Sequence, residues 1–140
     1  MNPQEQEKIY NEVNEKATNE NNQLLRFNLA IDFLNTKQQL PFLATSGKHN
    51  EIVNRALNSA RLHIDELIDI NKFDEAKKFC VEAKEKLQNL YGLNNKLLHV
   101  ATMENLFEVY HYRIIDRNYI FDAKNKIEEI EKKSESKIYE

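Results

Sequence analysis

The 140-residue chain has few of the residues that break helices or cross-link small domains. It contains two glycines, two prolines, one cysteine and no tryptophan. So little glycine and proline favours long helices joined by few tight turns. The single cysteine, Cys80, cannot form a disulfide within the chain. We therefore expect a reducing, cytoplasmic location.

Long apolar runs and a strong charge bias are also missing. No stretch approaches the ~18 apolar residues that a membrane-spanning helix needs, so we expect no membrane partner. The formal net charge is -3, with lysine and glutamate interspersed, which disfavours nucleic-acid binding. The polar, acidic N-terminus resembles neither a secretory signal nor a transit peptide. The length fits one domain with a core of its own.

The pattern that is present is helical, and it is clearest from Ala56 to Ala83. Apolar residues recur there at spacings of three and four on both sides of a short polar joint, Asn71-Lys72. Small residues recur on the apolar stripes of both helices, so the two helices can approach each other closely. The pattern predicts an antiparallel hairpin over about residues 49–91, with Asp74 and Glu75 in the first turn of its second helix.

The rest of the chain predicts further helices and no sheet, since no stretch alternates with a period of two. Residues 1–21 read as a polar N-terminal arm or a short helix, and residues 22–140 as a single helical domain. A helix over about 22–40 precedes Pro41 and a loop at Gly47. Gly92 suits a helix end, and Asn94-Asn95 suits the cap of the next helix.

A second hairpin is expected over about residues 96–133. Its joint would be Arg117-Asn118-Tyr119. Four side chains of its second helix would face the core. These four are Ile120, Ala123, Ile127 and Ile130. The predicted fold is therefore all-α: antiparallel helical hairpins stacked as a short solenoid or a compact bundle.

The two predicted joints have similar sequences. Residues 67–76 and 114–123 both carry an apolar pair, an acid, a polar joint, an apolar or aromatic residue, then an acid and alanine, at a separation of 47 residues (123 − 76). This pattern resembles the tetratricopeptide repeat superfamily. Phe73, Ala76 and Ala83 match its positions in the first unit, and Tyr110, Ile120 and Ala123 match in part in the second.

The resemblance covers about residues 52–130 and departs from the family in three respects. The usual period is about 34 residues, asparagine replaces the turn glycine, and Ile130 stands where a small residue belongs. Longer-period families, such as bacterial peptide-sensing regulators and kinesin light chains, fit about as well. Residues 93–100 and Ile138-Tyr139 also look like the N-terminal helical solenoid of proteasome-lid scaffold subunits, although asparagines replace both acids of that motif.

A tetratricopeptide-like stack would form a groove lined by the first helix of each hairpin. By resemblance, three residues would line it from each unit: Asn58, Arg61 and Asp65 from the first, and Asn105, Glu108 and Tyr112 from the second. The set mixes charges and lacks the lysine and asparagine pattern that grips a peptide carboxylate. Any peptide recognition would thus be polar.

Few residues point to catalysis or to a cofactor. His63 lies too close to Asp65 and Glu66 to place two ligands well, and His99 and His111 are twelve residues apart. A structural zinc site needs more than one cysteine, so we expect neither a metal nor another cofactor. Cys80 lies on an apolar stripe, which favours a buried, inert thiol over a nucleophile.

A cluster at residues 110–113 combines aromatics with an arginine, a composition typical of binding hot spots. Tyr110 fits the core, whereas Tyr112 and Arg113 fall on another face and are the better contact residues. The lysines at 77, 78, 84 and 86 lie among glutamates, so we interpret that face as a solvated mixed surface.

We therefore predict a non-enzymatic protein-interaction module or scaffold, which binds a partner peptide or helix in a groove. Self-association into a homo-oligomer is a further prediction, because two repeats leave their end faces only partly capped. The alternative is a small helical regulator or inhibitor acting on a nucleic-acid enzyme or complex.

Overall fold

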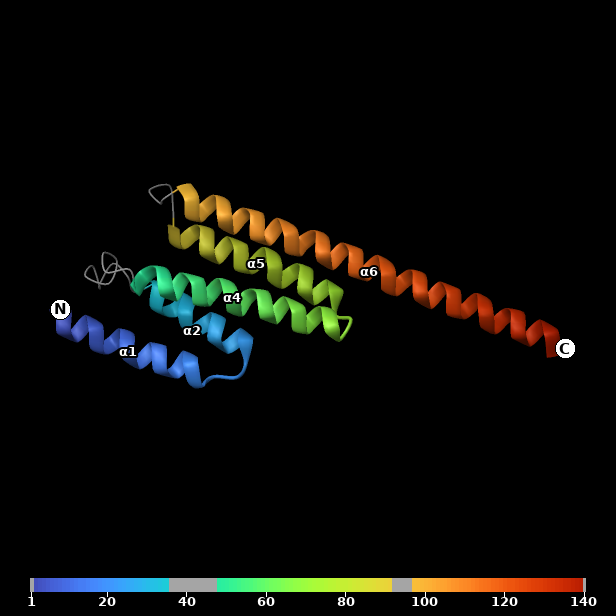
Figure 1. The fold of residues 1–140 in the computed structure, drawn as a ribbon, viewed down its shortest axis with the longest axis horizontal. Helices are drawn as coiled ribbons and strands as arrows, with labels where there is room; N and C mark the ends of the chain where they lie inside the picture. The colour runs from blue at the N-terminus through green and yellow to red at the C-terminus, as the bar shows by residue number, and fades with distance from the viewer. Residues whose placement is uncertain (1, 36–47, 92–96, 140) are drawn as a thin grey trace.

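The computed structural model describes residues 2–35, 48–91 and 97–139, with side chains in these ranges except at 48–50, 90–91, 97–104 and 137–139. These residues form helices and the short joints between them, and no strand occurs among them. The predicted all-α class is confirmed. Figure 1 shows the helices packed side by side, with the last one running well past the others. The helices are α1 (Pro3–Asn19), α2 (Gln23–Asn35), α4 (Lys48–Asp69), α5 (Phe73–Tyr91) and α6 (Leu97–Tyr139).

Most of the N-terminal segment is helical, as α1, and this helix contributes to the core. Asn2 caps it by accepting a hydrogen bond from the amide of Glu5 at 2.8 Å, and Pro3 follows at the first helical position. The helix buries Tyr10 and Ala17 against its neighbours. Arg26 Nε of α2 donates to the carbonyl of Ala17 at 2.6 Å, which fixes the two helices together.

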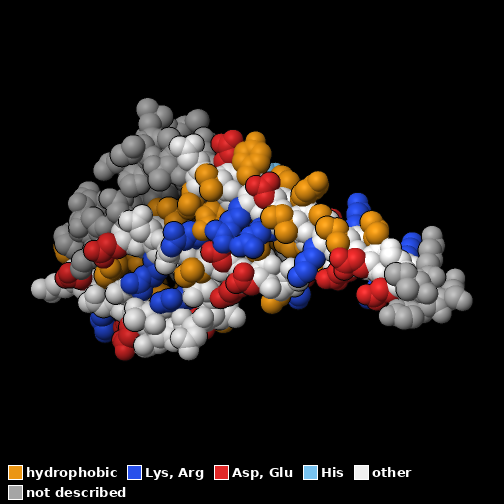
Figure 2. Space-filling model, turned by 45° about the vertical axis from the view of Figure 1, so that its right-hand side comes forward, with side chains coloured by type: hydrophobic (Ala, Val, Ile, Leu, Met, Phe, Trp, Pro, Cys, Tyr) orange, Lys and Arg blue, Asp and Glu red, His pale blue; other side chains and the backbone are white. Residues whose placement is uncertain are grey.

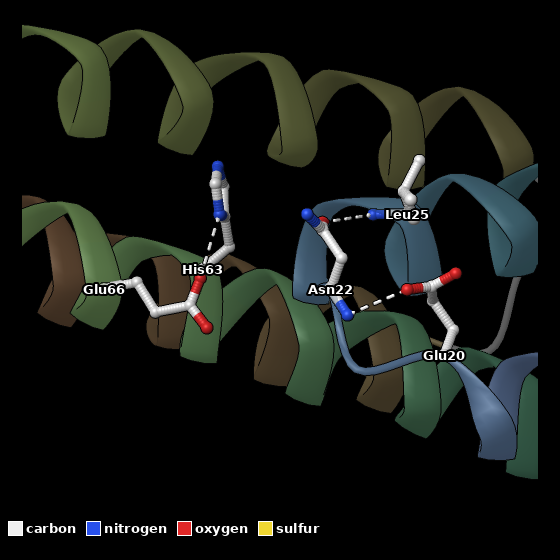
Figure 3. Close-up of polar contacts among 5 residues, drawn as sticks. All are labelled: Glu20, Asn22, Leu25, His63 and Glu66. Carbon is white, nitrogen blue, oxygen red and sulfur yellow. Dashed lines mark hydrogen bonds and ion pairs between the residues drawn. The ribbon is translucent and has the colours of Figure 1, made fainter.

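The joint between α1 and α2 is held by Asn22. Its side-chain oxygen accepts from the amide of Leu25 at 3.1 Å, as expected of a residue capping a helix N-terminus. Its own amide donates to a carboxylate oxygen of Glu20 at 3.0 Å (Figure 3). These two bonds satisfy backbone donors at the turn, so the chain reverses with only a few residues between the helices.

The α4–α5 hairpin forms as predicted. Asn71 has a positive φ of 61°. The amide of Lys72 donates to the carbonyl of Leu67 at 2.8 Å, and that of Asn71 to Ile68 at 3.0 Å. This bond pair is the Schellman motif, in which a left-handed residue closes the end of a helix. Asp74 and Glu75 lie in the first turn of α5 as expected.

The core lies where α2, α4, α5 and the first half of α6 meet. Small side chains predicted to let α4 and α5 approach closely are fully buried: Ala56, Ala60, Ala76 and Ala83. Larger side chains fill the space between them. Those with almost no exposed surface are Phe27, Leu34, Ile52, Ile64, Leu87 and Ile114.

The predicted second hairpin is wrong, because α6 is a single continuous helix from Leu97 to Tyr139. Arg117, Asn118 and Tyr119 are helical and form no joint. The helix packs on α5 and α4 with its first half and then projects beyond the α4–α5 joint, as Figure 1 shows. None of the described residues packs back on the projecting part, so the antiparallel helix predicted after residue 119 is not formed.

The side chains predicted to point inward from that helix therefore do not. Ile120, Ile127 and Ile130 are exposed, and only Ala123 is partly buried. Other predictions lie outside the described residues. They are the end of the helix predicted over 22–40, the break at Pro41, the loop at Gly47, and the helix end and cap at Gly92, Asn94 and Asn95.

Candidate interaction surfaces

Four of the seven predicted partner-binding residues meet where α4 and α6 face each other. Asn58, Arg61 and Asp65 project from α4, and Arg113 projects from α6. Arg61 donates from Nη2 to the side-chain oxygen of Asn58 at 2.7 Å. Arg113 Nη2 lies 3.3 Å from Asp65 Oδ1 in an ion pair. We call these four residues, together with Tyr110, the α4/α6 seam.

Tyr110 is the buried member of the seam. The guanidinium of Arg113 lies 5.8 Å from the centre of its ring. Burial raises the pKa of the Tyr110 hydroxyl; the charge of Asp65 adds to that rise, and Arg61 and Arg113 oppose it. A shallow hollow of about 190 Å³ borders the seam, between Asn58 and Arg61 on one side and Leu106 on the other. The charges of the seam thus mostly interact with one another.

The other three predicted residues lie elsewhere on α6. Glu108 and Tyr112 border a hollow of about 490 Å³ between α5 and α6. Asn105 is exposed on the side of α6 away from its buried residues Phe107 and Ile114. The structure therefore does not bring the seven predicted residues to one groove, because α6 turns Glu108 and Tyr112 toward α5 or solvent and Arg113 toward α4.

Cys80 lies beside the hollow between α5 and α6 but is itself buried. Its thiol contacts the carbonyl oxygen of Phe107 as a weak donor at 3.6 Å. Burial raises the pKa of the thiol, and Lys84 only partly offsets that rise. A thiol with a raised pKa carries little of the nucleophilic thiolate, which agrees with the inert role predicted for it.

His63 is held by neighbours on its own hairpin. Its ring meets Phe79 edge-on, with ring centres 4.6 Å apart. Its Nδ1 atom lies 3.5 Å from a carboxylate oxygen of Glu66 (Figure 3). Within the part of the chain that the structure describes, no three side chains of histidine, cysteine, aspartate or glutamate gather closely enough to hold a metal ion.

The sequence analysis missed an apolar surface that runs along α6. Six large side chains on α6 are more than half exposed. They are Val109 (62%), Tyr112 (59%), Tyr119 (75%), Ile120 (60%), Ile127 (56%) and Ile130 (63%). At about 100° per residue they fall within one stripe that covers roughly a quarter to a third of the helix circumference. We call them the α6 stripe.

The α6 stripe lies opposite the residues that α6 buries, which are Phe107, Tyr110 and Ile114. Along the packed half of α6 it therefore faces away from the bundle, except that Tyr112 at its edge borders the hollow against α5, and it continues along the projecting half. Asp116 and Ala123 share its side of the helix by the same spacing. Figure 2 shows hydrophobic side chains lying among charged ones along the described part of the projecting segment.

Helical spacing is the signal that identifies this stripe, provided that the helix is continuous. Val109, Tyr112, Tyr119 and Ile120 join Ile127 and Ile130 at spacings that keep one face only when no joint interrupts residues 117–119. The sequence analysis predicted a joint at residues 117–119. With a joint there, the two halves of the stripe belong to different helices and no longer share one face.

In comparisons with known proteins, no family model, no curated protein and no solved structure matches the chain. The resemblance to tetratricopeptide repeats and to proteasome-lid scaffold subunits therefore stays a prediction. None of the helices in the described residues is long and apolar enough to cross a membrane.

Proposed function

We propose that this chain is a non-enzymatic protein-interaction module, and that its docking surface is the α6 stripe. The observation that carries the proposal is the row of large apolar side chains along a helix that projects from the bundle. A cytoplasmic location belongs to the same proposal, supported by the free, buried thiol of Cys80.

The composition of the stripe supports a protein partner. Tyr112 and Tyr119 offer large, amphipathic contact surfaces of the kind that dominate binding energy at protein interfaces. Contiguous exposed apolar surface beyond a few hundred Å² marks interaction sites in general. A partner helix with an apolar face would pack along the stripe, with anchors spaced by three and four residues.

The charges of the projecting segment argue against lipid or nucleic acid as the occupant. Residues 117–136 carry five basic side chains (Arg117, Lys124, Lys126, Lys132 and Lys133) and five acidic ones (Asp122, Glu128, Glu129, Glu131 and Glu135). Helices that lie on anionic membranes, and proteins that bind nucleic acid, need an excess of positive charge. A balanced set instead suits a protein surface with charges of both signs.

The α4/α6 seam is a less favourable docking surface. Arg61 already binds Asn58, and Arg113 already pairs with Asp65. A partner would have to replace these interactions, whereas the side chains of the stripe lose only water when they are covered.

Affinity capture from lysate of the source cell tests the proposal. The tagged chain is compared with a Tyr112→Asp/Ile127→Asp variant, which places charge in both halves of the stripe. Its matched control is Asn125→Asp/Ser136→Asp, which adds the same charge at exposed positions on the opposite side of α6. We expect the wild-type chain and the control to retain the same proteins in similar amounts. The stripe variant should retain those proteins in amounts lower by about tenfold or more.

Capture of an identical protein set by the stripe variant would overturn the assignment. All four substituted positions lie outside the core, so we expect each variant to fold. Circular dichroism of each variant checks that its helices are intact. An Arg61→Glu variant examines the α4/α6 seam separately. If the stripe carries binding, this variant keeps the captured proteins.

A further inference from the structure

The outer half of the α6 stripe is bordered by charged side chains, and these charges indicate what kind of surface could cover it. Beyond Lys124 every described side chain is exposed, so the bundle leaves this part of α6 uncovered. Four large members of the stripe lie in or next to this part: Tyr119, Ile120, Ile127 and Ile130. Any partner must cover these four side chains and match the charges that border them.

Those bordering charges follow a pattern along each edge of the stripe. Along one edge, at helical spacing, the order is Lys124 followed by Glu131. Along the other edge the order is Asp122, followed by Lys126 and then Lys133. Each edge therefore changes sign between its two ends, and the change occurs in opposite directions on the two edges.

A second copy running antiparallel satisfies both edges at once. In an antiparallel pair related by a twofold axis, each edge of the stripe meets the same edge of the other copy in reverse order. Lys124 then faces Glu131, with a midpoint at 127.5, and Asp122 faces Lys133, with a midpoint at 127.5 as well. Two independent charge pairs thus place the axis at the same position, beside Ile127.

Asp116 distinguishes the two possible directions. Parallel copies would also bring opposite charges together along the edges. However, they would place Asp116 directly against Asp116 of the second copy within the apolar stripe, where like charges are costly. The antiparallel arrangement leaves Asp116 at the edge of the overlap, near the C-terminal end of the other helix.

The covered area is sufficient for a specific but weak interface. Four side chains of this size, each more than half exposed, amount to on the order of 500 Å² per copy, or about 1,000 Å² in total before the charged edges are added. That total reaches the lower end of specific protein interfaces, for which micromolar affinity is common.

We infer that the occupant of this half of the α6 stripe is a second copy of the chain, packed antiparallel about a twofold axis beside Ile127. The inference rests on the proposed function and names the partner for its surface. Val109 and Tyr112 lie outside the overlap and stay exposed in the dimer. The dimer thus leaves an apolar contact surface free on each copy.

Sedimentation equilibrium of the full chain over roughly 5–200 µM tests the inference, because an interface of this area dissociates in that range. We expect the mass to rise from 16.6 kDa toward twice that value. Ile127→Asp should keep it at 16.6 kDa throughout. Asn125→Asp adds the same charge two residues away on the opposite side of α6 and should dimerise like the wild type.

Disulfide trapping tests direction and register. A mixture of Lys124→Cys and Glu131→Cys copies should form a mixed disulfide dimer under mild oxidation. A mixture of Lys124→Cys and Asp122→Cys copies should do so only if the helices run parallel. The wild-type chain, with its buried Cys80, is the control for background oxidation.

Three outcomes decide between the two proposals. A monomer at every concentration that still captures other proteins through Tyr112 and Ile127 overturns the dimer and leaves the proposed function standing. If the chain is a monomer and captures the same proteins with or without the Tyr112→Asp and Ile127→Asp substitutions, both proposals are overturned. A dimer trapped by the parallel pair of cysteines, or one that survives Ile127→Asp, overturns the arrangement inferred for this surface.

Discussion

At the scale of single residues, Tyr10 connects the first helix to the rest of the molecule. Its hydroxyl donates a hydrogen bond to the carboxylate of Glu51, on α4. Nearby, Arg55 of α4 donates to the carbonyl of Asn14 at 3.2 Å and to the hydroxyl of Thr18 at 3.1 Å. A short polar helix is thus attached to α4 by a few polar contacts around a buried aromatic ring.

The Tyr10 contact predicts a specific response to alkaline pH. Burial, followed by the bond to Glu51 and its charge, raises the pKa of Tyr10 to about 12, from 10.0. Folding therefore holds the phenol proton more tightly than the unfolded chain does. The contribution of this group is fully present below pH 10 and is lost as the pH rises toward 12.

Replacing Tyr10 with phenylalanine removes that proton. At pH 7 we expect Tyr10→Phe to lower the free energy of unfolding by about 1.5–3 kcal/mol, the usual contribution of a hydrogen bond to a charged group. Between pH 10 and 12 the wild type should lose stability more steeply than the variant, so that the two curves converge. Urea unfolding followed by circular dichroism measures both. Parallel curves across that window would show that Tyr10 does not carry the effect.

Which residues are buried was largely predictable, but which residues pair was not. The spacing of Ala56, Ala60, Ala76 and Ala83 placed them on facing stripes, and burial follows directly from that periodicity. The pairing of Asp65 with Arg113 depends on the distance and rotation between α4 and α6, which no local pattern encodes. Residues expected to face a partner therefore turned out to contact each other.

At the scale of elements, the α4–α5 joint depends on one left-handed residue. Asn71 adopts a φ of 61°, a conformation that a side chain with a Cβ adopts at a cost, although asparagine tolerates it better than most. The neighbouring amides of Asn71 and Lys72 close the helix end by bonding to Ile68 and Leu67.

Substitution at this position should follow backbone conformation. We expect Asn71→Ala to lower the free energy of unfolding by about 1 kcal/mol and Asn71→Gly to leave it unchanged or slightly higher. Urea unfolding provides the measurement, with Lys72→Ala as the control, because Lys72 is exposed and lacks a positive φ. Equal stability of the alanine and glycine variants would mean that the joint does not depend on the left-handed conformation.

The two joints of the sequence analysis show where element prediction fails. Asn71 and Asn118 occupy matching positions in similar sequences, yet the chain turns at one and continues as a helix at the other. The turn at Asn71 lets Phe73 and Ala76 become buried, whereas the described side chains after Asn118 include none that is fully buried. Beyond it, good helix formers and lysine–glutamate pairs four residues apart favour continuation.

At the scale of the whole molecule, the structure divides into a packed bundle and a projecting arm. The last side chain of α6 in ring contact with the bundle is Phe121, whose ring centre lies 5.6 Å from that of Phe73. Since α6 rises about 1.5 Å per residue, the segment after it extends for roughly 27 Å. Its exposed isoleucines are unfavourable in water unless another surface covers them.

Removing the arm separates the stability of the bundle from the association of its copies. A chain ending at Asn125 keeps Phe121 and every fully buried side chain, so we expect its melting temperature at low concentration to lie within about 3 °C of the full chain. The full chain should melt at a higher temperature as its concentration rises, because association favours the folded state. The shortened chain should melt at one temperature throughout, and so should full-length Ile127→Asp. Calorimetry at several concentrations measures this difference, with Asn125→Asp expected to follow the wild type. A shortened chain that fails to fold would instead show that the arm stabilises the bundle within a single copy.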